Sequence, residues 1–258
     1  MSGRVAVVTG GSSGIGAAIA RRLAGDGWHS VLLARRGDVL EAVAREIGAD
    51  FEVCDVGDRA AVEQVAGRVL ERHPAIDLLV NNAGIPGRRG FLSADPETIE
   101  DVVRVNYLGS VWCLRAFLPG LEAAAAASVV NIVSVAGTVA FPPSGPYSAA
   151  KHAQLAFSRA VAAELRPHGI RVHTVLPGFV QTEGFPQRDV LKMPVLGRLV
   201  VGPDRVARHV VRMVEHGRRE SFVPRWYRIA SLAQALAPGL VHRAVSRARY
   251  RKPRASSD

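Results

Sequence analysis

Two residues, Tyr147 and Lys151, have types and a spacing that could do chemistry. They lie four positions apart at the predicted start of a helix, so both side chains project from one helical face. A tyrosine becomes an effective acid/base when its pKa falls from ~10 toward ~7, which takes about 4 kcal/mol of preferential phenolate stabilisation. One ammonium group ~4 Å away supplies about that much at an effective dielectric constant of ~20. The pair therefore predicts a tyrosine that exchanges a proton beside a lysine.

Lys151 stands out because the chain otherwise uses arginine for its positive charges. The sequence has 33 Lys and Arg residues, and no lysine other than Lys151 precedes Lys192. A flexible ammonium group with three donors can serve a cofactor ribose and a phenolate together, whereas the planar fork of arginine would not fit that role. An isolated Tyr/Lys pair is more often a surface pair, so the prediction depends on a cofactor site nearby.

A glycine-rich turn supplies such a site, because residues 9–16 read Thr-Gly-Gly-Ser-Ser-Gly-Ile-Gly between the first predicted strand and the first helix. Glycines let the backbone turn sharply and approach a pyrophosphate, whose charge is held by the amides and dipole at the helix start. The turn predicts a dinucleotide site whose candidate contacts are Gly10, Ser12, Ser13, Gly14, Ile15 and Gly16.

The end of the second predicted strand indicates which dinucleotide binds. A ribose 2′-hydroxyl is bound by an acidic side chain about 20 residues after the turn, whereas a 2′-phosphate is bound by arginine. This position carries Arg35 and Arg36, and a guanidinium engages phosphate oxygens in a two-pronged contact. NADP(H) is therefore favoured, with NAD(H) open as the alternative because both arginines could belong to the general arginine excess.

Hydrophobic patterning predicts the elements that position these residues. Apolar strands alternate with helices, which implies βαβ crossovers and a parallel sheet covered on both faces. The expected fold is an α/β, Rossmann-type, doubly wound sheet of about seven strands. The strands are predicted at residues 5–9, 30–34, 51–54, 76–80, 128–133, 170–175 and 221–223, and the helices at 17–23, 38–47, 59–71, 99–118, 147–165 and 203–215.

The alternation loosens between Gly178 and Gly202, which predicts a segment that covers the substrate. Residues 1–224 are expected to form the catalytic domain, and residues 225–258 a C-terminal helical extension that is amphipathic and basic. Such an extension can lie on an anionic membrane surface. It can equally pack over the active site or a neighbouring subunit, which we prefer.

Taken together, the motifs resemble those of the short-chain dehydrogenase/reductase family in its single-domain form, over residues 4 to 223. The matching positions are Thr9, Gly10, Gly14 and Gly16, Asp55, Asn81-Asn82-Ala83-Gly84, Asn106, Ser134, Tyr147 and Lys151, and Pro177-Gly178 with Thr182. The resemblance implies an NAD(P)-dependent oxidoreductase that transfers a hydride between the nicotinamide and a carbonyl or secondary alcohol.

The resemblance also implies a role for each position. Ser134 would hydrogen-bond the substrate oxygen, Tyr147 would exchange the proton, and Lys151 would bind the nicotinamide ribose and lower the tyrosine pKa. Asn106 would hold a water in a proton relay. The remaining implied cofactor contacts are Asp55 and Val56 at the adenine, Asn82, Ala83 and Gly84 beneath the cofactor, and Pro177, Gly178, Val180 and Thr182 near the nicotinamide.

Apolar residues in the covering segment and at Phe141-Pro142-Pro143 predict an apolar ketone or alcohol substrate. Those in the segment are Phe179, Val180, Phe185, Val190, Leu191, Met193, Val195, Leu196 and Leu199. The resemblance implies a homodimer or homotetramer formed through the helices at 99–118 and 147–165. Two rival functions stay open: a reductase of ketoacyl groups carried on an acidic carrier protein, and a dinucleotide-sensing protein without turnover.

Composition limits the remaining possibilities. The chain has 258 residues, is 48% hydrophobic and carries a net charge of +10. Half of that excess lies between Arg243 and the C-terminus, and we expect no nucleic-acid partner. Two cysteines are too few for a disulfide framework, and the scattered histidines show no metal-ligand spacing, so we expect a cytoplasmic protein without a metal site.

Overall fold

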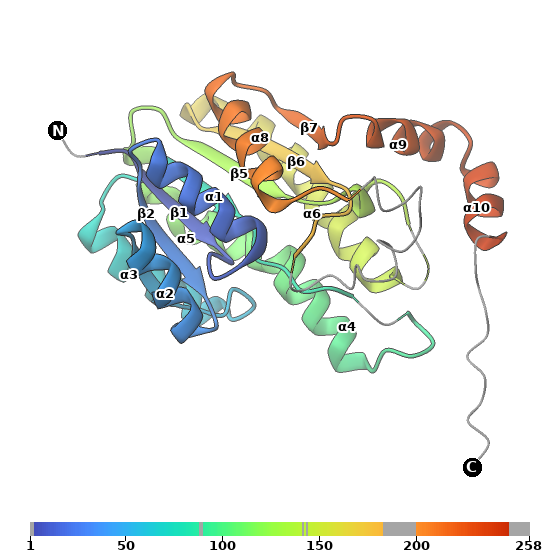
Figure 1. The fold of residues 1–258 in the computed structure, drawn as a ribbon, viewed down its shortest axis with the longest axis horizontal. Helices are drawn as coiled ribbons and strands as arrows, with labels where there is room; N and C mark the ends of the chain where they lie inside the picture. Colours follow the sequence, from blue (N-terminus) through green and yellow to red (C-terminus); the bar gives the residue numbers. More distant parts are fainter. Residues whose placement is uncertain (1–2, 88–89, 141, 143, 183–199, 248–258) are drawn as a thin grey trace, which may run out of the picture.

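A seven-stranded sheet organises the part of the chain that the structure, a computed structural model, describes: residues 3–87, 90–140, 142, 144–182 and 200–247. The strand order is β3-β2-β1-β4-β5-β6-β7 and every pairing is parallel (Figure 1). This confirms the predicted doubly wound fold. The strands are β1 (Val5–Thr9), β2 (His29–Ala34), β3 (Asp50–Val53), β4 (Leu78–Asn81), β5 (Ser128–Ile132), β6 (Arg171–Pro177) and β7 (Glu220–Val223).

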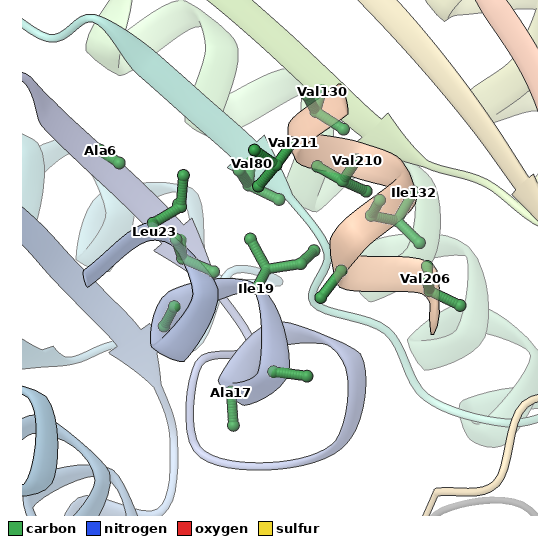
Figure 2. Close-up of a cluster of buried hydrophobic side chains, with 14 of the residues drawn as sticks. Ala6, Ala17, Ile19, Leu23, Val80, Val130, Ile132, Val206, Val210 and Val211 are labelled. Carbon is green, nitrogen blue, oxygen red and sulfur yellow. The ribbon is translucent and has the colours of Figure 1, made fainter. Parts of the chain in front are cut away.

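Helices cover both faces of the sheet because the central strands are apolar on both sides. On one face lie α1 (Gly14–Gly25), α2 (Gly37–Ile47) and α8 (Pro203–Glu215), and on the other α3 (Arg59–Arg72), α5 (Gly109–Ala123) and α6 (Gly145–Glu164). Successive β1 side chains alternate between the two cores. Figure 2 shows the first core, where Ile19 and Leu23 of α1 meet Val210 and Val211 of α8.

The helix predicted at residues 99–118 contains a widened turn. It begins as α4 (Pro96–Val103), passes through the π-helical turn η1 (Arg104–Leu108) and continues as α5. Single π-helical turns insert an extra residue into a helix and often mark functional sites. Here the turn carries Asn106, which is fully buried.

A row of polar residues crosses the sheet inside the second core. Asn81 of β4 lies opposite Asn131 of β5, which lies opposite Thr174 of β6. The Nδ2 of Asn81 donates to the Oδ1 of Asn131 at 2.9 Å, and the Nδ2 of Asn131 donates to the Oγ of Ser158 at 2.8 Å. Ser158 and Thr174 complete the row with a hydroxyl–hydroxyl bond of 2.7 Å. The three strands are therefore linked by side chains as well as by their backbones.

The chain after β7 forms α9 (Tyr227–Leu236) and α10 (Pro238–Arg247), which extend away from the sheet (Figure 1). Only the start of α9 enters a core, where Tyr227 packs with Leu176 and Phe222. Large apolar side chains stay exposed in the described part of this C-terminal arm: Trp226, Ile229, Leu232, Leu236 and Leu240. Among the described residues, no helix combines the length and apolar character required to cross a bilayer.

Candidate active site

The carboxyl ends of six neighbouring strands, β1 to β6, gather most of the predicted site residues at one edge of the sheet. Thr9, the last residue of β1, ties this edge together. Its Oγ1 accepts the backbone N–H groups of Asn82 at 2.9 Å and Ala83 at 3.0 Å. The Nδ2 of Asn82 donates back to the Thr9 carbonyl at 2.9 Å. The segment after β4 is thus held beside the glycine-rich turn.

The glycine-rich turn has a backbone that only glycine fits. Gly10 and Gly14 have φ of +67° and +57°, in the left-handed region that side chains rarely adopt. A Cβ on Gly16 would lie 2.2 Å from the Gly10 carbonyl oxygen. Ser13 precedes α1 without capping it through its side chain, so the first amides of α1 stay available to an anion. This cradle fits a pyrophosphate.

Two arginines extend the cradle on the β2 side. The Nη2 of Arg36 donates to the Ser13 Oγ at 3.0 Å, and the Nη1 of Arg35 lies 3.7 Å from the Asp55 Oδ2. Arg35 and Asp55 both line a cavity of ≈ 420 Å³ next to η1. The structure therefore brings Arg35 and Asp55 to one cavity. Arg36 does not line this cavity, and Val56 is buried in the second core.

The side chains of Tyr147 and Ser134 interact at the centre of the site. Tyr147 lies in the first turn of α6, and Ser134 directly precedes the short 3₁₀ helix η2 (Val135–Gly137). Burial raises the pKa of the Tyr147 hydroxyl, and its interaction with the Ser134 side chain lowers it in part. This arrangement would let both hydroxyl groups contact one substrate oxygen.

Lys151 lies one turn along α6 and is 3% exposed. Its Nζ donates to the Ile132 carbonyl at 3.2 Å and to the Gln154 Oε1 at 2.8 Å, and lies 5.9 Å from the centre of the Tyr147 ring. Both acceptors are neutral, so burial lowers the pKa of the Lys151 amine to about 7.

The predicted lowering of the Tyr147 pKa by Lys151 stays a prediction. In this structure the pKa of Tyr147 is raised, and the cause is burial. The predicted pair is present, but burial removes water from both groups and disfavours both the ammonium and the phenolate. The spacing of the residues says nothing about this desolvation.

Asn106 presents a buried acceptor at the same edge. Its Nδ2 donates to the carbonyls of Ile85 and Val102, each at 2.9 Å, but among the described residues its Oδ1 has no partner. A Cβ on Gly84 would lie 2.7 Å from that oxygen, so glycine lets the segment after β4 pass closely. A buried oxygen without a protein partner is a natural site for an ordered water.

The predicted residues after β6 divide into two groups. Thr182 lies against the glycine-rich turn, with its Cγ2 3.1 Å from where a Gly14 Cβ would be. Gly178 instead packs against the ring of Tyr227, and Val180 is buried and pairs with Val201. Pro177 ends β6.

In the glycine-rich turn, Ser12 is buried and the side chain of Ile15 packs against the first core. Ile15 can therefore meet a ligand only through its backbone.

Two residues near the site were missed by the sequence analysis. Gln154 holds Lys151 and donates to the Ser110 Oγ at 2.7 Å, and its position three residues after Lys151 on one helix was the available signal. Tyr227 was assigned to the extension by its apolar spacing.

Several predicted substrate-covering residues lie outside the described part: Phe141, Pro143, Phe185, Val190, Leu191, Met193, Val195, Leu196 and Leu199.

The chain is similar to known proteins over most of its length. The family described as short chain dehydrogenase matches residues 4–189. Dehydrogenase/reductase SDR family member 4 of Rattus norvegicus is 38% identical over 188 residues, covering 70% of this chain and 67% of that protein.

Solved structures are similar over a larger share of the chain. An alcohol dehydrogenase from the archaeon Thermococcus sibiricus, complexed with 5-hydroxy-NADP, has a TM-score of 0.75 at 30% identity, covering 86% of this chain and 96% of that one. A variant of the actinorhodin polyketide ketoreductase with NADPH has a TM-score of 0.75 at 32% identity, covering 82% and 90%.

Proposed function

Because this chain belongs to the short-chain dehydrogenase/reductase family of NAD(P)-dependent oxidoreductases, we propose that it is an NADPH-dependent reductase of apolar ketones in which Tyr147 donates the proton. The observation that carries this proposal is that the side chains of Ser134 and Tyr147 interact beside buried Lys151. A sensor without turnover would not need these proton-transfer groups together.

The nicotinamide of the bound cofactor supplies the hydride that the carbonyl carbon accepts. Ser134 and Tyr147 hold the carbonyl oxygen, and the Tyr147 hydroxyl gives it the proton, so the product is the alcohol and the residue left behind is a phenolate. The raised pKa of Tyr147 keeps its proton in place at neutral pH, which suits reduction. Lys151 stabilises the phenolate in its ammonium form, and the Oδ1 of Asn106 positions a water that returns the proton.

Replacing Tyr147 tests the mechanism directly. We expect Tyr147→Phe to lower kcat at least ~100-fold with a panel of ketones, because a general acid contributes about that much or more. NADPH binding, followed by fluorescence titration, should stay within about threefold. Tyr107→Phe is the matched control, since Tyr107 lies in η1 with its ring against Phe157. Equal rates in the Tyr147 variant and the wild type would refute the assignment.

Cofactor preference is proposed from Arg35 and Arg36, which would contact the 2′-phosphate at the position where NAD(H) carries a hydroxyl. Loss of a charge-assisted hydrogen bond of ~1.5–3 kcal/mol should raise the KM for NADPH roughly 10- to 100-fold in Arg36→Ala. The KM for NADH should change little. Arg45→Ala removes a similar exposed arginine, paired with Glu41, and should leave both values unchanged. Equal effects of Arg36→Ala on the two cofactors would contradict NADP(H) preference.

A second candidate substrate is a ketoacyl group on an acidic carrier protein. A cavity of ≈ 520 Å³ beside β7 is lined by Arg218, Arg219, Arg225 and Arg228, and these charges would suit an acidic partner. The structural similarity to a polyketide ketoreductase supports the same substrate class. If carrier delivery matters, Arg218→Glu with Arg219→Glu should lower kcat/KM for the carrier-bound ketone and not for the same ketone on a small thiol.

Assembly and location are proposed on separate grounds. A homodimer or homotetramer through α4–α5 and α6 follows from the family, and light scattering would measure its mass. Cys54 and Cys113 are both buried free thiols, which is consistent with the proposed cytoplasmic location.

A further inference from the structure

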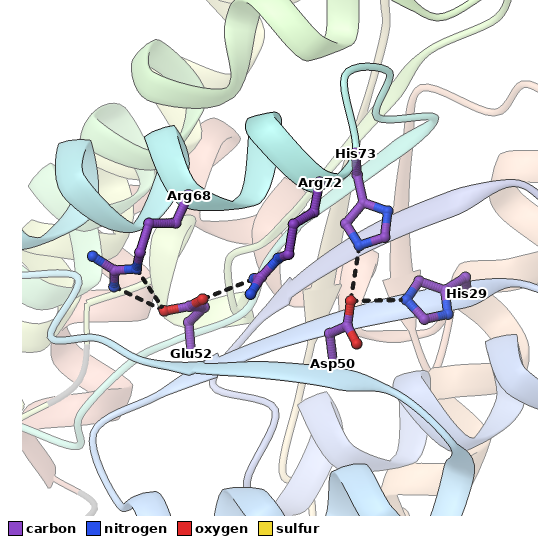
Figure 3. Close-up of polar contacts among 6 residues, drawn as sticks. All are labelled: His29, Asp50, Glu52, Arg68, Arg72 and His73. Atoms are coloured by element: carbon purple, nitrogen blue, oxygen red, sulfur yellow. Dashed lines mark hydrogen bonds and ion pairs between the residues drawn. The ribbon is translucent and has the colours of Figure 1, made fainter.

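Three potential metal ligands converge at the edge of the sheet opposite the active site. His29 is the first residue of β2, Asp50 is the first residue of β3, and His73 follows the last residue of α3. The Nε2 atoms of both histidines contact the same carboxylate oxygen, Oδ2 of Asp50, at 3.1 Å and 2.8 Å (Figure 3). The sequence analysis expected no metal site, because these residues are far apart along the chain. His29 lies 21 residues before Asp50, and His73 lies 23 residues after it.

The donor set and its spacing fit a small divalent cation. One donor atom from each residue lies within 4.8 Å of the other two. A tetrahedral zinc ion with bonds of ~2.0–2.2 Å needs ligand atoms about 3.3–3.6 Å apart, so small side-chain rotations would open the cluster around an ion. Two imidazoles and one carboxylate are ligands that Zn²⁺ accepts, and the 40% exposure of the Asp50 side chain leaves room for water as a fourth ligand.

The charges around the cluster do not oppose a cation. Two arginines beside the cluster, Arg68 and Arg72, both turn toward Glu52 and bind it at 2.8 Å and 2.7 Å (Figure 3). Their charges are therefore partly compensated on the side away from Asp50. The carboxylate of Asp50 faces only the two imidazoles among the contacts shown there.

We propose that His29, Asp50 and His73 form a binding site for a divalent transition cation of the Zn²⁺ type, which ties the starts of β2 and β3 to the end of α3. A cation that binds the folded chain and not the unfolded chain stabilises the fold by RT ln(1 + c/Kd), where c is the free cation concentration. The site lies at the amino ends of the strands and Tyr147 lies at their carboxyl ends, so the cation acts on stability and takes no part in the reaction.

Zinc titration of the tag-free, chelator-treated full chain tests the site. We expect one ion per chain by calorimetry, and a melting temperature that rises by a few degrees in excess ZnCl₂. His73→Asn and Asp50→Asn should each weaken binding at least ~10-fold and abolish the thermal shift. The control His168→Asn removes an exposed histidine that contacts a single carboxylate, Glu122, and should bind as the wild type does.

A second measurement on the wild-type chain needs no substitution. Paramagnetic Co²⁺ should broaden the imidazole resonances of His29 and His73 at concentrations that leave those of His168 sharp. The proposal is overturned if His168 broadens first, if the wild type shows no thermal shift with zinc, or if His73→Asn binds zinc with unchanged affinity and stoichiometry.

Discussion

The amine of Lys151 is buried, where its positive charge is unfavourable. Its side chain is 3% exposed, and its two hydrogen-bond acceptors, the Ile132 carbonyl and Gln154, are both neutral. Burial lowers the pKa of the amine to about 7. The charged and neutral forms are therefore close in free energy near neutral pH, and a phenolate on Tyr147 would shift the balance toward the ammonium.

This lowered pKa predicts a pH dependence of stability. Above pH 7 the folded chain releases the Lys151 proton, whereas the unfolded chain keeps it up to its ordinary value of 10.5. The unfolded state then binds more protons, so the free energy of unfolding rises with pH over this window, by at most ~1.4 kcal/mol per pH unit. Denaturant unfolding of the wild type and Lys151→Met at pH 7, 8 and 9 should show a difference that grows in favour of the wild type. A constant difference would contradict a lowered pKa.

At this scale, residue types and spacing predicted which side chains lie close together but not their ionisation. Tyr147, Lys151 and the glycine-rich turn could be found because their chemistry requires short, fixed separations along the chain. Gln154 reaches Ser110, 44 residues away, and such a contact exists only after folding. Burial of Lys151 is likewise a property of the packed core, so the sequence could not reveal its lowered pKa.

One junction between elements joins the C-terminal arm to the active-site edge. Tyr227, the first residue of α9, occupies the space that a side chain at position 178 would need, because a Cβ there would lie 1.9 Å from its ring. The Tyr227 hydroxyl accepts the backbone N–H of Phe179 at 3.3 Å, and Trp226 stacks on its ring at 3.9 Å. The turn after β6 is therefore shaped by a residue from the arm.

A double-mutant cycle tests this junction. Gly178→Ala should destabilise the fold by about 1–3 kcal/mol, because the added methyl group displaces the Tyr227 ring. In a Tyr227→Ala background the same substitution should cost close to nothing, which gives a coupling energy of similar size. Gly25→Ala, where a Cβ would meet nothing within 4 Å, is the control. Equal costs of Gly178→Ala in both backgrounds would show that Tyr227 does not fill this space.

Hydrophobic periodicity predicted nearly every strand and helix within a few residues, because a parallel sheet demands apolar strands and helices with one apolar face. The widened turn η1 was not predictable in this way. Its backbone bonds differ from those of an α-helix without any change in the apolar pattern, and it is fixed by packing around Asn106, whose Nδ2 reaches the Ile85 carbonyl.

At the scale of the whole molecule, the described part of the C-terminal arm places exposed apolar side chains near a basic surface. Ile229, Leu232 and Leu236 of α9 are 69%, 48% and 83% exposed, and the arginine-lined cavity beside β7 lies at the base of the arm. Contiguous exposed apolar groups usually meet a partner surface. An apolar face next to arginines would suit an anionic membrane.

Vesicle flotation separates a membrane surface from a second subunit. We expect the wild type to float with vesicles containing anionic lipid at low salt and less at high salt. Ile229→Gln, Leu232→Gln and Leu236→Gln together should abolish flotation, whereas Phe91→Gln with Leu92→Gln, at 78% and 79% exposure, should not. If the triple variant floats as the wild type does, the arm is not a membrane contact. If light scattering gives a smaller mass for the triple variant than for the wild type, the arm is a subunit contact instead.

The alternation of strands and helices was sufficient to predict the architecture of the molecule, since few topologies satisfy it. Its surfaces were not predictable to the same degree. His29, Asp50 and His73 come together only because β2, β3 and α3 are neighbours in the folded chain.

The polar row of Asn81, Asn131, Ser158 and Thr174 has a consequence for how the strands find one another. A shift of one strand by a single position would turn an amide side chain out of the row. Its former partners would then be buried without a hydrogen bond, which costs ~1–3 kcal/mol of stability for each group. Valine and leucine side chains make no hydrogen bonds, so a register shift in a purely apolar layer carries no such penalty. The row thus acts as an alignment mark that makes mispaired forms of the sheet costly.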